Sequence, residues 1–153
     1  MITKIISAII IFGIIAIIPT AYGQLGLGPE ANQKSIEAFI DKSENVNAKH
    51  IVYSSNNPGN VPLFYGIVEN SLKVTNEDGI EIEFGRIGND IEGLTGLLIF
   101  ASQKNTIIEY DLMEVKTLED NLWSLDLEYP KTFSIIIDSE INSIFLNNNL
   151  IEL

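Results

Sequence analysis

Apolar and polar residues alternate with a period of two along most of the chain after residue 48. The alternation is clearest over residues 122–129, where one face carries only aromatic and leucine side chains: Trp123, Leu125, Leu127 and Tyr129. This pattern is typical of strands with one buried and one solvent-facing side. Turn-forming residues separate such segments at roughly ten-residue intervals, as in sandwiches and barrels. We therefore expect residues 49–153 to form a mainly β domain, an antiparallel β-sandwich or barrel of about seven to nine strands.

Individual strands follow from the same alternation. They are expected over residues 49–54, 62–69, 94–102, 107–115 and 122–129, with hairpins over 72–84 and 133–146. Residues 94–102 are nearly all apolar, so this segment is expected to be a central strand covered on both faces. Residues 85–93 contain three glycines and are expected to form an irregular loop.

One segment shows a helical pattern instead. Within residues 30–44, the apolar residues Ile36, Phe39 and Ile40 lie at i, i+3 and i+4, which places them on one face of a helix. We expect one N-terminal amphipathic α-helix here, so that a leader and this helix occupy residues 24–48. No second helical pattern follows residue 44, which argues against helix-linked parallel strands.

The first 23 residues have the pattern of an export signal. Lys4 supplies a positive charge, residues 5–18 form an unbroken run of apolar and small residues, and Pro19 ends it. This run is shorter than the roughly 20 residues that a membrane-spanning helix needs. We therefore predict a signal-peptide helix over residues 1–23, cleaved before Gln24. The alternative is an uncleaved membrane tether, and either places the protein outside the cytoplasm, secreted or associated with the cell envelope.

Charge and composition narrow the classes of partner. The net charge is -12, and because Lys4 is the only charged residue in the signal, the exported part carries a net charge of -13. Such a surface repels nucleic acids and anionic lipid head groups, so we expect no nucleic-acid binding and no direct membrane binding after cleavage. The chain has no cysteine and one histidine, His50, which excludes cysteine chemistry and the usual zinc or copper site within one chain.

Two predicted loops contain side-chain oxygens of the kind that Ca²⁺ binds. The candidate ligands are Asn76, Glu77, Asp78, Asn89, Asp90 and Glu92. Their spacing does not match an EF-hand loop. The same residue types also favour ordinary turns, so a bound Ca²⁺ and a purely structural role are both open.

Aromatic residues suggest a ligand-binding surface. Tyr53, Phe64 and Tyr65 flank the turn-rich residues 55–60, and binding groups tend to lie on loops. They are therefore the candidate ligand-binding residues. Trp123 and Tyr129 share their face with leucines, which favours core packing instead.

Pairs of carboxylates raise the alternative of an enzyme. Glu81 with Glu83, Glu109 with Asp111, and Asp126 with Glu128 are two residues apart, so each pair lies on one strand face about 7 Å apart. Inverting glycosidases use a similar separation, but any strand with an acidic outer face produces the same spacing. His50 shares a strand face with Ser54 only at about 13 Å, which is too far for a nucleophile and its base.

The sequence thus favours an exported, acidic β domain that acts as a non-enzymatic binding or interaction module, with Ca²⁺ as a candidate cofactor. Its expected partner is a protein or carbohydrate at the cell surface. One alternative is a small secreted polysaccharide hydrolase that uses carboxylates. Another is a subunit of a surface assembly, in which apolar edge strands such as residues 133–137 pair between copies of the chain.

Cleavage of the predicted signal can be tested directly. N-terminal sequencing of the exported protein should begin at Gln24, because Ala21 and Gly23 provide the small residues that signal peptidase recognises. A sequence that begins at Met1 would instead support the membrane tether.

Overall fold

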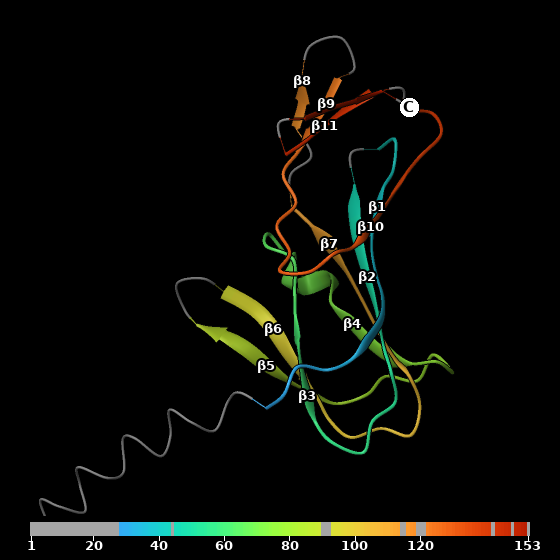
Figure 1. Ribbon diagram of the computed structural model, residues 1–153, viewed down its shortest axis with the longest axis vertical. Coiled ribbons are helices and arrows are strands. Elements are labelled where there is room, and N and C mark those ends of the chain that lie inside the picture. Colours follow the sequence, from blue (N-terminus) through green and yellow to red (C-terminus); the bar gives the residue numbers. More distant parts are fainter. Residues whose placement is uncertain are drawn as a thin grey trace, which may run out of the picture.

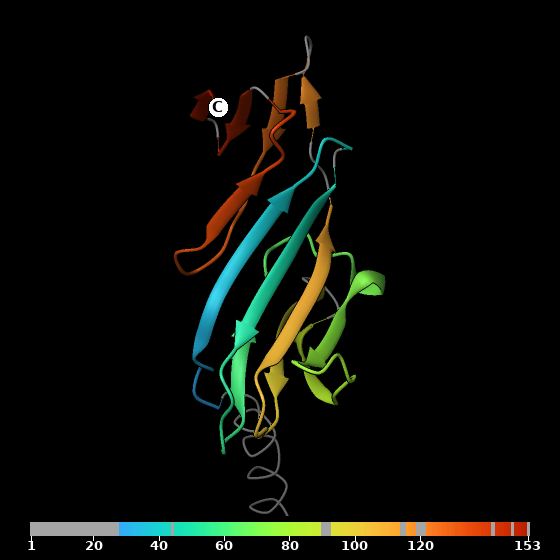
Figure 2. The ribbon, with the colours of Figure 1, turned by 90° about the vertical axis from the view of Figure 1, so that its right-hand side faces the viewer.

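The computed structural model describes residues 28–43, 45–89, 93–113, 116–118, 122–141, 143–147 and 149–152 (Figures 1 and 2). The predicted signal-peptide helix and its cleavage site lie outside these residues. The described part is mainly β, as the alternation of apolar residues predicts. Within it, no helix has the length and apolarity needed to cross a membrane.

Strands account for the regular structure of the described residues, apart from one short 3-10 helix, η1 (Glu69–Ser71). The strands are β1 (Gln33–Ile40), β2 (Val46–Val52), β3 (Gly59–Pro62), β4 (Lys73–Asn76), β5 (Phe84–Asn89), β6 (Gly93–Ile99), β7 (Thr106–Leu112), β8 (Lys116–Leu118), β9 (Leu122–Leu125), β10 (Ser134–Ile137), β11 (Ser143–Leu146) and β12 (Asn149–Glu152).

The strands form three sheets. The five-stranded sheet has the order β10-β1-β2-β7-β4, the four-stranded sheet the order β12-β11-β9-β8, and the three-stranded sheet the order β3-β6-β5. The three-stranded sheet lies against one side of the five-stranded sheet, and the four-stranded sheet lies beyond its end (Figures 1 and 2). None of the three sheets closes on itself within the described strands, so the barrel alternative is wrong for this part of the chain.

The core lies between the five-stranded and three-stranded sheets. In β2 and β7 every second residue is buried, as period-two alternation requires. These residues belong to the same buried cluster as Val61 of β3 and Leu97 of β6. The chain crosses between these two sheets after β2, β3, β4 and β6, and a bridge between Ser55 and Ser102 joins the first and the last of these crossings.

The predicted N-terminal helix over residues 30–44 is wrong, because residues 33–40 form the strand β1. Ile36, Ala38 and Ile40 are buried in alternation, whereas Phe39, which completed the helical pattern, is 40% exposed. β1 pairs with β2 on one side and with β10 on the other. β2 follows β1 after a short turn, but the ladder with β10 involves residues far along the chain, so a local pattern could not reveal it.

Most pairs among the described strands are antiparallel, as expected, but two pairs are parallel. β1 pairs with β10 in parallel, and so does β9 with β11. The predicted hairpin over residues 133–146 does not form, although its turn does, since the Ile141 N–H donates to the Asp138 carbonyl (3.0 Å). At this turn the chain passes from the five-stranded to the four-stranded sheet, so β10 pairs with the distant β1, whereas β11 pairs with β9 and β12.

The glycine-containing segment 85–93 is not simply a loop. Its first part is β5, which pairs with β6. A Cβ on Gly85 would lie 3.1 Å from the Leu98 Cβ, so this glycine permits close packing between the strands. β6 is central in its sheet, as predicted, but Thr95 on it is exposed, so it is not covered on both faces.

The predicted strand over residues 62–69 does not form, because the observed strand β3 ends at Pro62. This proline has no N–H to continue a ladder. Beyond it the chain turns at Gly66, where φ is +85°, a conformation that favours glycine. Residues 63–67, which follow β3 and do not belong to the three-stranded sheet, form one wall of the groove described below.

A close approach at Gly59 sets the path by which the chain enters β1. A Cβ on this residue would lie 2.8 Å from the Ala31 Cβ and 2.9 Å from the Ala31 Cα. We expect Gly59→Ala to lower the free energy of unfolding by about 1–3 kcal/mol, because the added methyl overpacks a backbone contact. Urea unfolding measures the change. Gly28→Ala, where the nearest atom would be 3.9 Å away, is the matched control and should have little effect.

Candidate binding groove

Four chain segments surround an open groove of about 750 Å³. Residues 63–67 and 69 follow β3, residues 93–95 begin β6, Met113 follows β7, and residues 128–130 follow β9. The lining is mainly apolar, with Leu63, Phe64, Leu94 and Tyr129 among its members and Glu69 and Glu128 as its acidic residues. Clefts of this size with a few polar groups are typical of binding sites.

Backbone hydrogen bonds hold the wall of the groove in place. The Leu63 N–H donates to the Thr95 carbonyl (3.0 Å), and the Met113 N–H donates to the Gly66 carbonyl (2.8 Å). The Tyr65 N–H reaches the Glu128 carbonyl at 3.4 Å. The segment is therefore bound to β6, to the end of β7 and to the chain after β9, although it is not a strand itself.

Two large side chains of this groove are exposed to solvent. Tyr65 is 79% exposed and Met113 is 63% exposed. The turn at Gly66 and its hydrogen bond to Met113 bring the two residues to the same part of the groove. Apolar side chains grouped in this way beside a cleft mark a surface suited to a partner.

Acidic groups flank the apolar lining. The Glu69 carboxylate forms an ion pair with Arg86 and accepts a hydrogen bond from the Leu94 N–H (3.3 Å). Glu128, also in the lining, is exposed. The groove therefore combines apolar surface with negative charge, in keeping with the net charge of the chain.

A buried polar network lies beneath the groove and centres on His50, which is 0% exposed. Its Nδ1 lies 2.8 Å from Gln33 Oε1, which can only accept, so Nδ1 carries the proton. Nε2 then accepts from the Tyr110 hydroxyl (2.8 Å), and that hydroxyl accepts from the Phe64 N–H (2.9 Å). Every polar atom of the imidazole is thus satisfied in its neutral form.

The same network extends to the groove through Tyr129. Gln33 Nε2 donates to the Tyr129 hydroxyl (2.9 Å), which donates to the Pro62 carbonyl (3.3 Å). The Tyr129 and Phe64 rings are in contact, with centroids 4.6 Å apart, and the Tyr129 ring centroid is 5.5 Å from that of His50. The position of the groove floor is therefore tied to the hydrogen bonds of the core.

A β-bulge places Gln33 in this network. The register of β1 against β2 shifts between Gln33 and Ser35, so that Gln33 is opposite Val52 while Ser35 is opposite Ile51. Such an extra residue turns a side chain to the other face of the strand. Gln33 thereby joins the side of β1 that faces His50 and Tyr129.

Burial controls the ionisation of this cluster. It lowers the pKa of His50 from 6.5 to about 4 and raises the pKa of the Tyr110 hydroxyl. Burial also raises the pKa of Tyr129, although the hydrogen bond from Gln33 acts in the opposite direction. All three groups are neutral at pH 7, which suits a network that stabilises a core rather than one that transfers protons.

The three candidate ligand-binding aromatics do not form one surface. Tyr65 and Phe64 both line the groove, but Phe64 is 1% exposed and its ring belongs to the core beneath the groove. Phe64 therefore presents almost no surface to a ligand, because its ring packs against Tyr129. Tyr53 is exposed but lines a separate, smaller pocket of about 270 Å³ together with Phe100.

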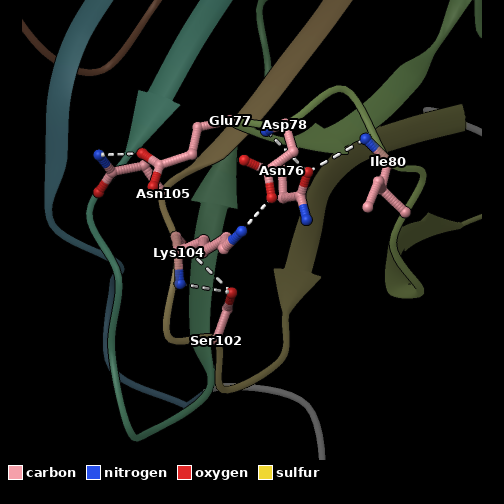
Figure 3. A network of polar contacts seen from close by, with 7 residues as sticks. All are labelled: Asn76, Glu77, Asp78, Ile80, Ser102, Lys104 and Asn105. Atoms are coloured by element: carbon pink, nitrogen blue, oxygen red, sulfur yellow. Dashed lines mark hydrogen bonds and ion pairs between the residues drawn. The ribbon is translucent and has the colours of Figure 1, made fainter.

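The first half of the candidate Ca²⁺ site forms a compact turn (Figure 3). Asn76 Oδ1 accepts hydrogen bonds from the N–H groups of Asp78 (2.9 Å) and Ile80 (3.1 Å). The Asp78 carboxylate forms an ion pair with Lys104, and Glu77 accepts from the Asn105 side chain (3.1 Å). Each of the three predicted ligands thus has a partner from the protein, and Lys104 supplies the positive charge.

The second half of that candidate site is only partly described. Asn89 pairs with Gly93 at the start of β6, while Asp90 and Glu92 lie outside the described residues. The first half contacts Lys104 and Asn105, which follow the other end of β6, so about 20 Å of strand separates the two halves. Among the described residues, no three acidic or histidine side chains converge in a way that could hold a metal ion.

The carboxylate pair of β7 lies on the outer face of its sheet. Glu109 forms an ion pair with Lys49 at 3.0 Å, and Asp111 accepts a hydrogen bond from the Asn47 side chain. These partners stand opposite the two carboxylates in the register of β2 against β7. The pair is therefore part of the polar outer face of a strand, which also produces a two-residue spacing of carboxylates.

Met113 and Glu69 were not identified from the sequence. The buried residues of β7 are even-numbered, so the alternation itself placed Met113 on the outward side at the end of the strand. A methionine at a position that the alternation predicts to be exposed was therefore the sequence feature that could have identified Met113. Glu69 had none, because its position in the groove depends on the path of residues 63–68 between two sheets.

The buried imidazole should make stability depend on pH. The unfolded chain binds a proton at His50 near pH 6.5, but the folded protein does so only near pH 4. The stabilisation is therefore complete above pH 6.5 and is lost as the pH falls through about 4. From pH 7 to pH 4 we expect His50 to account for a loss of about 3 kcal/mol in the free energy of unfolding.

Urea unfolding of the wild type and of His50→Gln at several pH values isolates this contribution. The variant should be less stable at pH 7 but should lose less stability on acidification. Equal pH dependence in the two proteins would show that His50 does not titrate as the structure implies.

Comparison of the chain with models of known families, with curated proteins and with solved structures finds no match. Its function therefore has to be inferred from its own residues.

Proposed function

We propose that the protein is an exported, non-enzymatic binding module that captures an apolar segment of a partner protein at the cell envelope. The groove beside Tyr65 and Met113 is the binding surface. The export signal predicted over residues 1–23 supports this location. The partner segment carries basic residues beside its apolar ones.

The observation that carries the proposal is the exposure of Tyr65 and Met113 beside an apolar groove. Burying a large apolar side chain gains about 1.5–3 kcal/mol relative to leaving it in water. The fold leaves both side chains exposed while it fixes the backbone that carries them. A partner that covers them gains this energy at little cost in ordering the protein.

Charge determines which apolar segment fits best. The exposed Glu128 lines the groove, and the whole chain has a net charge of -12. Basic residues beside the bound segment are attracted to this surface, whereas acidic ones are repelled. The same field raises the rate at which a basic partner arrives.

This function does not require Ca²⁺. The candidate ligands Asn76, Glu77 and Asp78 contact Lys104, Asn105 and backbone N–H groups, and they do not line the groove. Catalysis is also not required, because the buried imidazole of His50 is separated from solvent and fully hydrogen-bonded.

Two fluorescently labelled peptides test the proposal by fluorescence polarisation. The first has the sequence Lys-Lys-Leu-Leu-Phe-Leu-Lys-Lys, and the second replaces its lysines with glutamates. The lysine peptide should bind the wild type more tightly. The double variant Tyr65→Ser/Met113→Ser should weaken that binding about tenfold or more, because it removes the apolar contacts.

The double variant Tyr53→Ser/Phe100→Ser is the matched control, since it removes two exposed aromatics from the separate pocket. It should leave the affinity for the lysine peptide unchanged. Equal losses in the two double variants, or equal binding of the two peptides, would contradict the proposed groove.

A further inference from the structure

The two edges of the five-stranded sheet differ in how they are covered. At one edge, residues 80–82 pair along β4, with hydrogen bonds from Asn76 N–H to the Ile80 carbonyl (2.8 Å) and from Ile82 N–H to the Val74 carbonyl (3.1 Å). At the other edge, β10 pairs with β1 on one side, and no described strand pairs with its second side. Figure 2 shows β10 at the open margin of the sheet.

The open edge has none of the features that usually prevent association. β10 has the sequence Ser-Ile-Ile-Ile, without charge, proline or bulge. Natural sheets normally protect exposed edges with such residues or with a covering segment. On the outer face Ile136 is 46% exposed, and its register partner Phe39 is 40% exposed. The edge and its apolar face are therefore both available for pairing.

The ladder with β1 shows which backbone groups are available. In a parallel ladder, one residue directs its N–H and C=O to the neighbouring strand and the next directs them away. The Asp138 N–H donates to the Ile40 carbonyl (2.9 Å), so the even-numbered residues of β10 bond to β1. Ile135 and Ile137 consequently present their N–H and C=O groups to the open edge.

From this geometry we propose that a second copy of the chain pairs with β10 in antiparallel fashion, so that the five-stranded sheets of two molecules become continuous. Ile135 of each copy bonds with Ile137 of the other, and Ile136 faces Ile136 of the second copy across the two-fold axis. This arrangement forms four backbone hydrogen bonds, because each such pair exchanges two. The proposal goes beyond the groove and does not depend on it.

Charges at the ends of the strand agree with this register. In this register Asp138 of one copy faces Ser134 of the other, so no like charges stand opposite one another along the paired strands. The net charge of -12 on each chain opposes association, so the dimer should be favoured by added salt.

Cysteine cross-linking tests the register, and no native cysteine competes with the introduced one, because the chain has no cysteine. Facing residues in a non-hydrogen-bonded antiparallel pair have Cα atoms about 4.5 Å apart, which a disulfide can span. Under mild oxidation, the purified full-length Ile136→Cys variant should therefore form a covalent dimer. The rate should be at least about tenfold higher than for Ser134→Cys, which faces Asp138 in this register.

Both variants keep the rest of the chain, so association through any other surface affects them equally. Equal rates, or faster cross-linking of Ser134→Cys, would overturn the proposed pairing.

Sedimentation of the wild type and of Ile136→Lys provides a second measurement. The wild type should dimerise more strongly at 0.5 M than at 0.05 M NaCl, and the variant, which places two lysines face to face, should stay monomeric. A wild type that is monomeric under both conditions would also overturn the proposal.

Discussion

A neutral, fully hydrogen-bonded imidazole in the core is the constraint on which much of the described structure depends. His50 lies on β2, and its partners come from the two strands beside it, Gln33 on β1 and Tyr110 on β7. An unsatisfied polar group at this depth would cost about 1–3 kcal/mol. The three strands therefore have to keep their register, and the bulge in β1 has to keep Gln33 turned inward.

The network also explains how Phe64 and Tyr129 are held in place in the groove while Tyr65 and Met113 stay exposed. Phe64 donates to the Tyr110 hydroxyl, and Tyr129 bonds to Gln33 and to the Pro62 carbonyl. These contacts anchor the chain on either side of Tyr65 to the core. Tyr65 and Met113 can then stay in solvent without loosening the fold, which is the preorganisation that a binding surface needs. Stability and the proposed binding thus depend on the same buried hydrogen bonds.

Several features were accessible from local pattern. The alternation around Ile108, Tyr110 and Leu112 correctly predicted a strand with Glu109 and Asp111 on its outer face. Other features depended on distant residues. β1 resembled a helix because Phe39 fell at helical spacing, but its hairpin with β2 and its ladder with the distant strand β10 keep it extended. Gly85 resembled a loop residue, but it serves close packing against Leu98.

The sequence by itself determined the mainly β class, the acidic character and the absence of cysteine chemistry, because these follow from composition and from a period of two residues. Tertiary structure decided which strands are neighbours, that β10 runs parallel to β1 at an open edge, and that Tyr65 is exposed while Phe64 next to it is buried. The physical reason is that alternation specifies which side of a strand is apolar but not which strand lies beside it. Sheet order, edges and grooves arise from hydrogen bonds and packing between residues far apart in the chain.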